Sequence, residues 1–138
     1  MSTEANKDLV RKSVESLDAG DFEKFIDFFA SDYVHHDPSH PEVTNRESLG
    51  PYLDAVAAAF PDMQQNIEDL VAEGDKVAKR YVINCTHKGE VAGIPPTNNR
   101  IAVHGTSVYR IENGKFVEGW HLTDNMGLMQ QIGAFPSQ

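Results

Sequence analysis

The stretch NGKFVEGWHLTDNMGLMQQIG, residues 113–133, guides the interpretation of the whole chain. Asn113 and Gly114 signal a hairpin turn, because both residues tolerate the positive φ that tight hairpins need. The segment 116–124 then carries aromatic and β-branched residues at strand spacing. It also holds an unusual density of polar and aromatic side chains, namely Glu118, Trp120, His121 and Asp124. We therefore expect this strand to line any pocket that the protein has.

Upstream of this hairpin, the apolar period is helical at first and extended afterwards. The pattern predicts helices over 3–17 and 21–30, and a third that Thr44 caps and that reaches Phe60, with a kink or restart near Pro51. It predicts long strands over 65–72, 76–87, 101–111 and 115–124. Three helices followed by four antiparallel strands indicate an α+β fold, with the helices on one side of a curved sheet and a cone-shaped hollow between them.

Length and composition limit the classes of function. The 138 residues predict one domain over 1–138. A net charge of −9 argues against a nucleic-acid partner. The apolar runs are too short for a membrane span, and the first residues lack the pattern of a signal peptide. The single cysteine, Cys85, cannot form an internal disulfide, so we expect a cytoplasmic protein.

The register of the last hairpin decides which side chains share a face. A two-residue loop would place Trp120 beside Ser107 and His121 beside Thr106. A three-residue loop would group His121 with Gly105, Ser107 and Tyr109. The opposite face would then hold His104, Thr106, Arg110, Glu118, Trp120 and Asp124. We favour the second arrangement, in which Arg110 and Glu118 are able to pair, although the sequence does not show which face is concave.

Either face offers acid/base chemistry, because a histidine titrates near neutrality and a neighbouring carboxylate fixes its tautomer. His104 with Asp124 is one such pair, and His121 near the hydroxyls of Ser107 and Tyr109 is another arrangement. We expect one histidine of the adjacent pair His35 and His36 to reach the pocket, because neighbouring side chains on an extended chain point to opposite sides. The segment HHDPSHPE, 35–42, contains residue types that bind metals, but we prefer its interpretation as a polar loop.

Several stretches resemble the SnoaL-like polyketide cyclases of the nuclear-transport-factor-like superfamily. They are HHDP at 35–38, FPD at 60–62, AEGDKVAKR at 72–80, THKGEVAGIPPT at 86–97 and YRIENGKFVEGWHLTDNMGLMQQIG at 109–133. The resemblance implies a cone-shaped α+β barrel that forms a homo-oligomer. It implies a pocket that takes a small hydrophobic molecule and holds neither cofactor nor metal. In such cyclases an acidic side chain on the last strand takes a proton from a polyketide carbon, and the enolate closes a ring by intramolecular aldol addition.

The family's functional residues fall on particular positions of this chain. By spacing from the turn, the catalytic aspartate of the cyclases falls on His121 here, and their histidine on the preceding strand falls on Ser107. Asp124 matches a second aspartate of the pattern. His35 or His36 matches the polar residue that the family places after its second helix. The chain therefore departs from the cyclases at the position of the base itself.

The leading hypothesis is a cofactor-independent enzyme that removes a proton from a hydrophobic, polyketide-like or aromatic carbonyl compound. His121 is the expected base, Asp124 and His104 are expected to orient it or to shuttle its proton, and His36 is expected at the mouth of the pocket. The expected substrate-binding residues are His35, Ser107, Trp120 and Tyr109. One alternative is a non-catalytic module for ligand binding or dimerisation. Another is an isomerase, dehydratase or epoxide-opening enzyme, for which Arg80 or Arg110 would supply the arginine.

Overall fold

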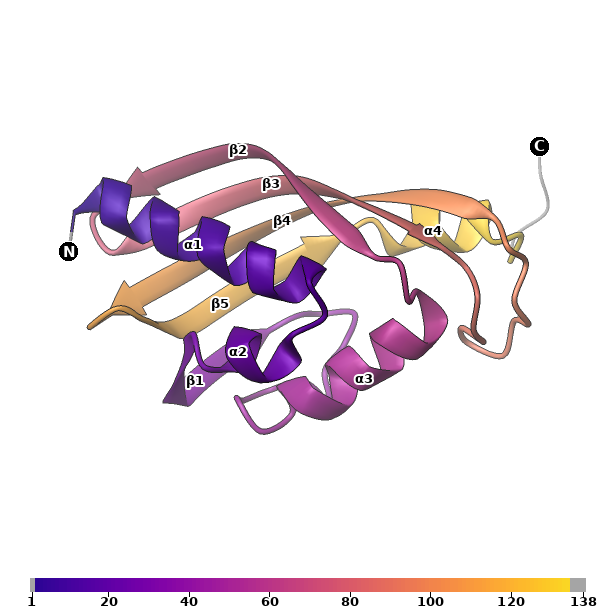
Figure 1. Ribbon diagram of the computed structural model, residues 1–138, viewed down its shortest axis with the longest axis horizontal. Coiled ribbons are helices and arrows are strands. Elements are labelled where there is room, and N and C mark those ends of the chain that lie inside the picture. Colours follow the sequence, from indigo (N-terminus) through magenta and orange to yellow (C-terminus); the bar gives the residue numbers. More distant parts are fainter. Residues whose placement is uncertain (1, 135–138) are drawn as a thin grey trace.

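The computed structural model describes residues 2–134, which form helices packed on one five-stranded sheet (Figure 1). The helices are α1 (Thr3–Asp18), α2 (Phe22–Ile26), α3 (Leu49–Ala59) and α4 (Asn125–Gln131). The strands are β1 (Phe29–His36), β2 (Gln64–Glu73), β3 (Lys76–Thr86), β4 (Arg100–Glu112) and β5 (Lys115–Thr123). Their order in the sheet is β1-β5-β4-β3-β2, and β1 runs parallel to β5 while the other pairs are antiparallel. The predicted α+β class is confirmed.

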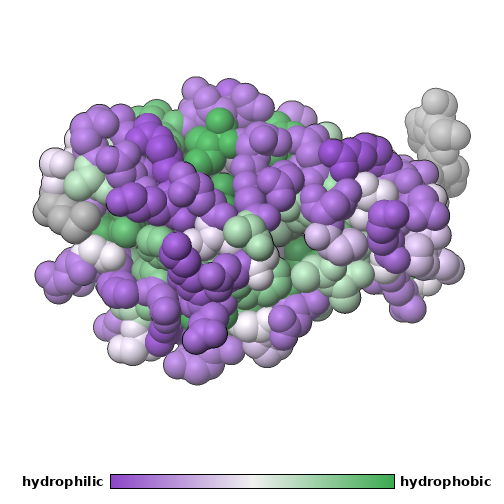
Figure 2. All heavy atoms as spheres, viewed as in Figure 1, coloured by the Kyte–Doolittle hydropathy of each residue, from purple (hydrophilic) through white to green (hydrophobic). Residues whose placement is uncertain are grey.

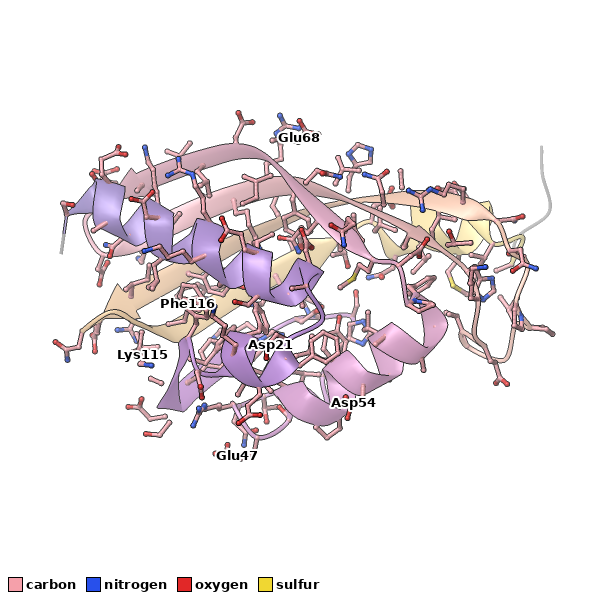
Figure 3. All side chains as sticks on the ribbon, viewed as in Figure 1. Asp21, Glu47, Asp54, Glu68, Lys115 and Phe116 are labelled. Carbon is pink, nitrogen blue, oxygen red and sulfur yellow. The ribbon has the colours of Figure 1, made fainter. Side chains whose placement is uncertain are left out.

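The sheet is curved, and α1, α2 and α3 cover its concave face (Figure 1). The larger core cluster lies between these helices and the strands, where Phe29, Tyr109 and Phe116 pack with ring centres 4.3 to 6.2 Å apart. Figure 3 shows Phe116 on β5 turned toward the helices and Glu68 on β2 turned away from them. Figure 2 shows that the surface on this side is mostly hydrophilic, with apolar atoms visible between the polar ones.

The second predicted helix is shorter than expected, and its end begins a strand that the sequence pattern did not assign to the sheet. Helix α2 stops at Ile26, and Phe29 already opens β1. Phe29 is 3% exposed and packs edge-on against Phe25 and Tyr33, so burial fixes it as a strand residue. The four phenylalanines of 21–30 thus divide between a helix, a turn and a strand, which the helical pattern of 21–30 did not predict.

The predicted capping box at Thr44 is also wrong. Helix α3 begins at Leu49, and the N–H of Thr44 instead donates to the hydroxyl of Ser48 in the turn that precedes it. Pro51 explains the late start, because a proline ring clashes with the carbonyl four residues earlier in a helix interior but is tolerated in the first turn. The expected restart near Pro51 is therefore the beginning of the helix.

The β4–β5 hairpin combines the two loop forms considered above. Glu112 pairs with Lys115, so the turn is the two residues Asn113 and Gly114, with φ of 51° and 72°. A bulge around Val117 then shifts the register by one residue, since Ile111 faces Phe116 whereas Arg110 faces Glu118. His121 consequently lies opposite Ser107, which is the facing pair predicted for the three-residue loop.

The end of the described chain is a helix that the sequence analysis did not predict. Asp124 caps α4 by accepting a hydrogen bond from the N–H of Gly127 at 2.9 Å. Ile132, 2% exposed, joins Cys85 and Ile101 in the smaller core cluster at this end of the sheet. Among residues 2–134, no helix is both long enough and apolar enough to span a membrane.

Candidate active site

Two adjoining chambers lie between the concave face of the sheet and the helices. The wide chamber has a volume of about 680 Å³ and is lined chiefly by apolar side chains of α3, β3, β4 and α4, among them Val56, Phe60 and Met129. The narrow chamber has a volume of about 140 Å³ and reaches the middle of the sheet. The two chambers form one site, because they share five lining residues: Tyr52, Val56, Met63, Ile83 and Thr123.

A chain of hydrogen-bonding side chains forms the floor of the narrow chamber. His121 Nδ1 lies 2.8 Å from Ser107 Oγ on β4, and its Nε2 lies 3.2 Å from Tyr33 Oη on β1. The same Tyr33 hydroxyl lies 2.8 Å from His35 Nδ1. The rings of His35 and His121 stack, with centres 4.3 Å apart and planes at 18°. Two imidazoles and two hydroxyls from three strands thus form one polar group beneath an apolar chamber.

Gly119 makes room for this contact between β1 and β5. A Cβ at this position would lie 2.5 Å from Tyr33 Oη and 2.7 Å from His121 Nε2, distances that real side chains do not tolerate. Tyr33 is 1% exposed and wedged against Phe29, so its ring cannot move aside freely. The absence of a side chain at Gly119 is therefore what lets the tyrosine hydroxyl reach His121.

Burial keeps both imidazoles of the floor neutral. It lowers the pKa of His35 to about 4, against the opposing influence of Asp37. Burial also lowers the pKa of His121 well below its usual range, and the nearby His35 and Lys79 add to the effect. A neutral imidazole has one unprotonated ring nitrogen, so His121 at neutral pH is in the form that a general base requires.

Lys79 on β3 is a further polar group of the narrow chamber, and sequence analysis missed it. Its side-chain nitrogen donates to Gln65 Oε1 and lies 4.7 Å from the ring centre of Tyr81. The side chain is only 4% exposed. Strand alternation contained the signal, because Val77, Lys79 and Tyr81 occupy the inward positions of β3. Tyr33 was likewise missed, since the sequence pattern placed no strand of the sheet before residue 65.

The structure separates the predicted site residues into two groups. His35, Ser107, Tyr109 and His121 line the narrow chamber. His36, by contrast, lies on the outer face of the sheet, where its Nε2 is 2.7 Å from Glu118 Oε2 and its ring stacks on Trp120. His104 is exposed on the same outer face, and the side chain of Asp124 is engaged as the cap of α4. The face that contains His121 is therefore the concave one.

Other predicted contacts follow the same division. The expected pair of Arg110 with Glu118 forms at 3.3 Å on the outer face, and Arg80 pairs there with Asp69 at 2.7 Å. Neither arginine lines a chamber. Cys85 is buried in β3 at the edge of the wide chamber, and burial raises the pKa of its thiol to about 11. Across residues 2–134, no three His, Cys, Asp or Glu side chains gather as metal ligands.

Comparisons with known proteins agree with this architecture. The aklanonic acid methyl ester cyclase DnrD of Streptomyces peucetius is 26% identical over 137 residues, which cover 96% of this chain and 92% of that protein. IdmH of Streptomyces antibioticus, a candidate polyketide cyclase, is 32% identical with a TM-score of 0.82, over 93% of this chain and 98% of that one. AclR of Streptomyces galilaeus, a candidate hydroxylase, is 28% identical with a TM-score of 0.91, over 99% and 86%.

The family profile described as "SnoaL-like polyketide cyclase" matches residues 7–132, which include every helix and strand that lines the two chambers apart from the first turn of α1. The resemblance inferred from the sequence motifs is thereby confirmed, as is the expectation of an enzyme of the cyclase kind at the level of the family. The chain belongs to the SnoaL-like polyketide cyclase family.

Proposed function

We propose that the protein is a cofactor-independent enzyme that closes a ring in a hydrophobic, polyketide-like carbonyl compound, with His121 as the base. The observation that carries the proposal is a neutral imidazole, flanked by two hydroxyls, at the floor of the narrow chamber, which adjoins the wide apolar one. Small-molecule sites commonly combine such an apolar wall with a few convergent polar groups. The volume of about 680 Å³ is ample for a fused-ring substrate.

The geometry supports a simple sequence of proton transfers. A carbon-bound proton next to a substrate carbonyl goes to His121, and the electron pair of that bond forms an enolate. The enolate carbon then adds to a second carbonyl of the same molecule, and the resulting alkoxide takes the proton back. Hydroxyl groups such as Ser107 Oγ, 2.8 Å from the imidazole, are positioned to donate to the developing oxyanion. General base catalysis of this kind contributes ~10²–10⁴-fold to rate.

Product mass and exchange of the substrate proton test this proposal. Aklanonic acid methyl ester, the substrate named for the relative DnrD, is the first compound to try. We expect an isomer of unchanged mass, together with deuterium uptake at the acidic carbon in D₂O. His121→Asn should lower both rates by roughly 10²-fold or more. His104→Asn, the same substitution on the outer face, is the matched control. Unaltered rates in His121→Asn would remove the base, and a product heavier by one oxygen would indicate hydroxylation instead.

A second candidate is a module that binds a small molecule without changing it. The observation in its favour is that both nitrogens of His121 already have hydroxyl partners, at 2.8 and 3.2 Å. A substrate proton can reach the imidazole only if one of these contacts opens. Saturable binding of the ester, with no isomer formed and no deuterium uptake, would favour this candidate over the enzyme.

We also propose that the chain forms a homo-oligomer through the outer face of the sheet. Val34, Trp120 and Leu122 project from neighbouring strands on this face and are 43%, 37% and 61% exposed. Exposed apolar side chains that lie together mark interaction surfaces more often than isolated ones do. Light scattering should give a mass above that of one chain, and Leu122→Glu should reduce it. A monomer in the unsubstituted protein would refute this proposal.

A further inference from the structure

Lys79 is a buried titratable side chain for which the proposed proton transfers give no role. It enters the narrow chamber from β3, between the inward residues Val77 and Tyr81. Its nitrogen donates to Gln65 Oε1 and lies 4.7 and 5.5 Å from the ring centres of Tyr81 and Tyr109. The amine is therefore held in place at the chamber wall.

The surroundings of this amine disfavour its charged form. Within residues 2–134, no carboxylate forms an ion pair with Lys79, and the Asp18 carboxylate of α1 instead accepts the backbone N–H of Gln65 at 2.8 Å. The titratable groups that face the amine are Asp18 from α1, Tyr81 from its own strand, Tyr109 from β4 and His121 from β5. Burial lowers the pKa of Lys79 to about 7, with Asp18 opposing it.

A neutral amine in an apolar pocket is a nucleophile toward carbonyl carbon. The narrow chamber offers about 140 Å³, which is similar to the ~150 Å³ of a protein cavity that accommodates one benzene ring. An aryl aldehyde or ketone, or the carbonyl-bearing end of a longer molecule in the wide chamber, fits this space. The buried amine and a carbonyl group are thus able to meet in the narrow chamber.

We propose that Lys79 forms an imine with a carbonyl group of a ligand bound in the narrow chamber. The amine nitrogen adds to the carbonyl carbon, and the carbonyl oxygen leaves as water with the two protons of the amine. The new C=N bond takes the place of C=O, and hydrolysis reverses the step. No oxidant, reductant or cofactor is required for this exchange.

The part of this inference that gives the imine a role in catalysis rests on the proposed function. If the imine nitrogen takes up one proton from solvent, the C–H bond on the carbon next to the C=N group becomes more acidic than the same bond beside a free carbonyl. Removal of that carbon-bound proton by His121 then gives a neutral enamine and an imidazolium. The electron pair of the broken C–H bond is delocalised onto the protonated nitrogen. This route therefore does not require a strong hydrogen-bond donor to an oxyanion. Imine formation itself needs no contribution from His121.

Reductive trapping tests the proposal on the full chain. The protein is incubated at pH 7 with benzaldehyde and sodium cyanoborohydride, and peptide mapping by mass spectrometry locates the benzyl groups. At this pH an ordinary lysine is almost wholly protonated, so Lys79 should react on the order of 100-fold faster than the exposed Lys76 of the same strand. The rate at Lys79 should rise with pH around 7, and benzyl alcohol, which lacks a carbonyl, should slow it by competition.

Matched variants keep the experiment decisive. Lys79→Arg should abolish the fast benzylation, whereas Lys76→Arg should retain it, with circular dichroism reporting the folding of both. An unmodified Lys79 in the unsubstituted protein, or labelling spread evenly over the exposed lysines, would overturn the proposal. His121→Asn separates the two ideas, because it should stop ring closure and leave Lys79 labelling intact. Ring closure that survives this substitution contradicts the proposed function and not the imine.

Discussion

Replacement of Gly119 by alanine should damage the site while leaving the sheet itself in place. The new Cβ would lie 2.5 Å from Tyr33 Oη, whereas ordinary contact begins at 3.4 Å, so the hydroxyl must retreat by about 0.9 Å. It would also lie 2.7 Å from His121 Nε2 and 3.2 Å from a ring carbon of Tyr109. Because Tyr33 is buried, we expect a loss of roughly 1–3 kcal/mol in the free energy of unfolding. If His121 is the base, a displacement of its ring by a similar amount should lower the rate on the order of 10²-fold.

Two measurements check the reasoning: urea unfolding, and deuterium uptake by aklanonic acid methyl ester. Gly50→Ala is the matched control, since a Cβ there meets nothing within 4 Å and the residue lies in α3, where alanine is favoured over glycine. The double variant Gly119→Ala with Tyr33→Phe removes the most crowded atom and should recover part of the lost stability, so the two effects are not additive. Full stability and full exchange in Gly119→Ala would refute the steric argument.

Four further predictions concern residues of the narrow chamber. Ser107→Ala should cost about 1 kcal/mol of stability in urea unfolding and lower the exchange rate, because it removes the partner of His121 Nδ1. His35→Asn should impair exchange, whereas His36→Asn on the outer face should not; equal effects would contradict the assignment of faces. The folded-state pKa of His35, about 4, lies below its unfolded value, so stability should fall as pH drops from 6.5 toward 4, less so in His35→Asn. The folded-state pKa of Lys79 is about 7 against 10.5 unfolded, so its protonated form is disfavoured by folding. Unfolding free energy should therefore rise between pH 7 and 10.5 relative to Lys79→Met, by a few kcal/mol at most, and a flat difference in calorimetry would contradict this.

Local periodicity predicted much of the fold because most of the sheet consists of sequential strands. β2 to β5 follow one another along the chain, and their alternation and turns are local signals. The pairing of β1 was not predicted, because β1 lies parallel to β5, which follows some eighty residues later in the chain, and no local pattern in the sequence indicates this contact. The bulge at Val117 was also hidden, although the grouping of His121 with Ser107 was predicted correctly from the favoured three-residue loop.

The candidate site was predicted in part for the same reason. His121, Ser107 and Tyr109 share a hairpin, so register alone groups them. The roles expected for Trp120 and His36 near a ligand depended on which face is concave, and this is set by the helices rather than by the hairpin. Lys79 escaped notice because a charged residue on an amphipathic strand is normally assigned to solvent. Only the position of Val77 and Tyr81 on either side of it marks it as inward.

The attachment of β1 has a consequence for how the protein acquires its activity. The Tyr33–His121 contact joins residues 88 positions apart, and β1 sits at the edge of the sheet. Edge segments open more readily than central ones, on free energies well below that of global unfolding. The floor of the narrow chamber is therefore complete only when the first third of the chain meets the last, and a transient detachment of β1 should break the Tyr33–His121 contact before the fold is lost.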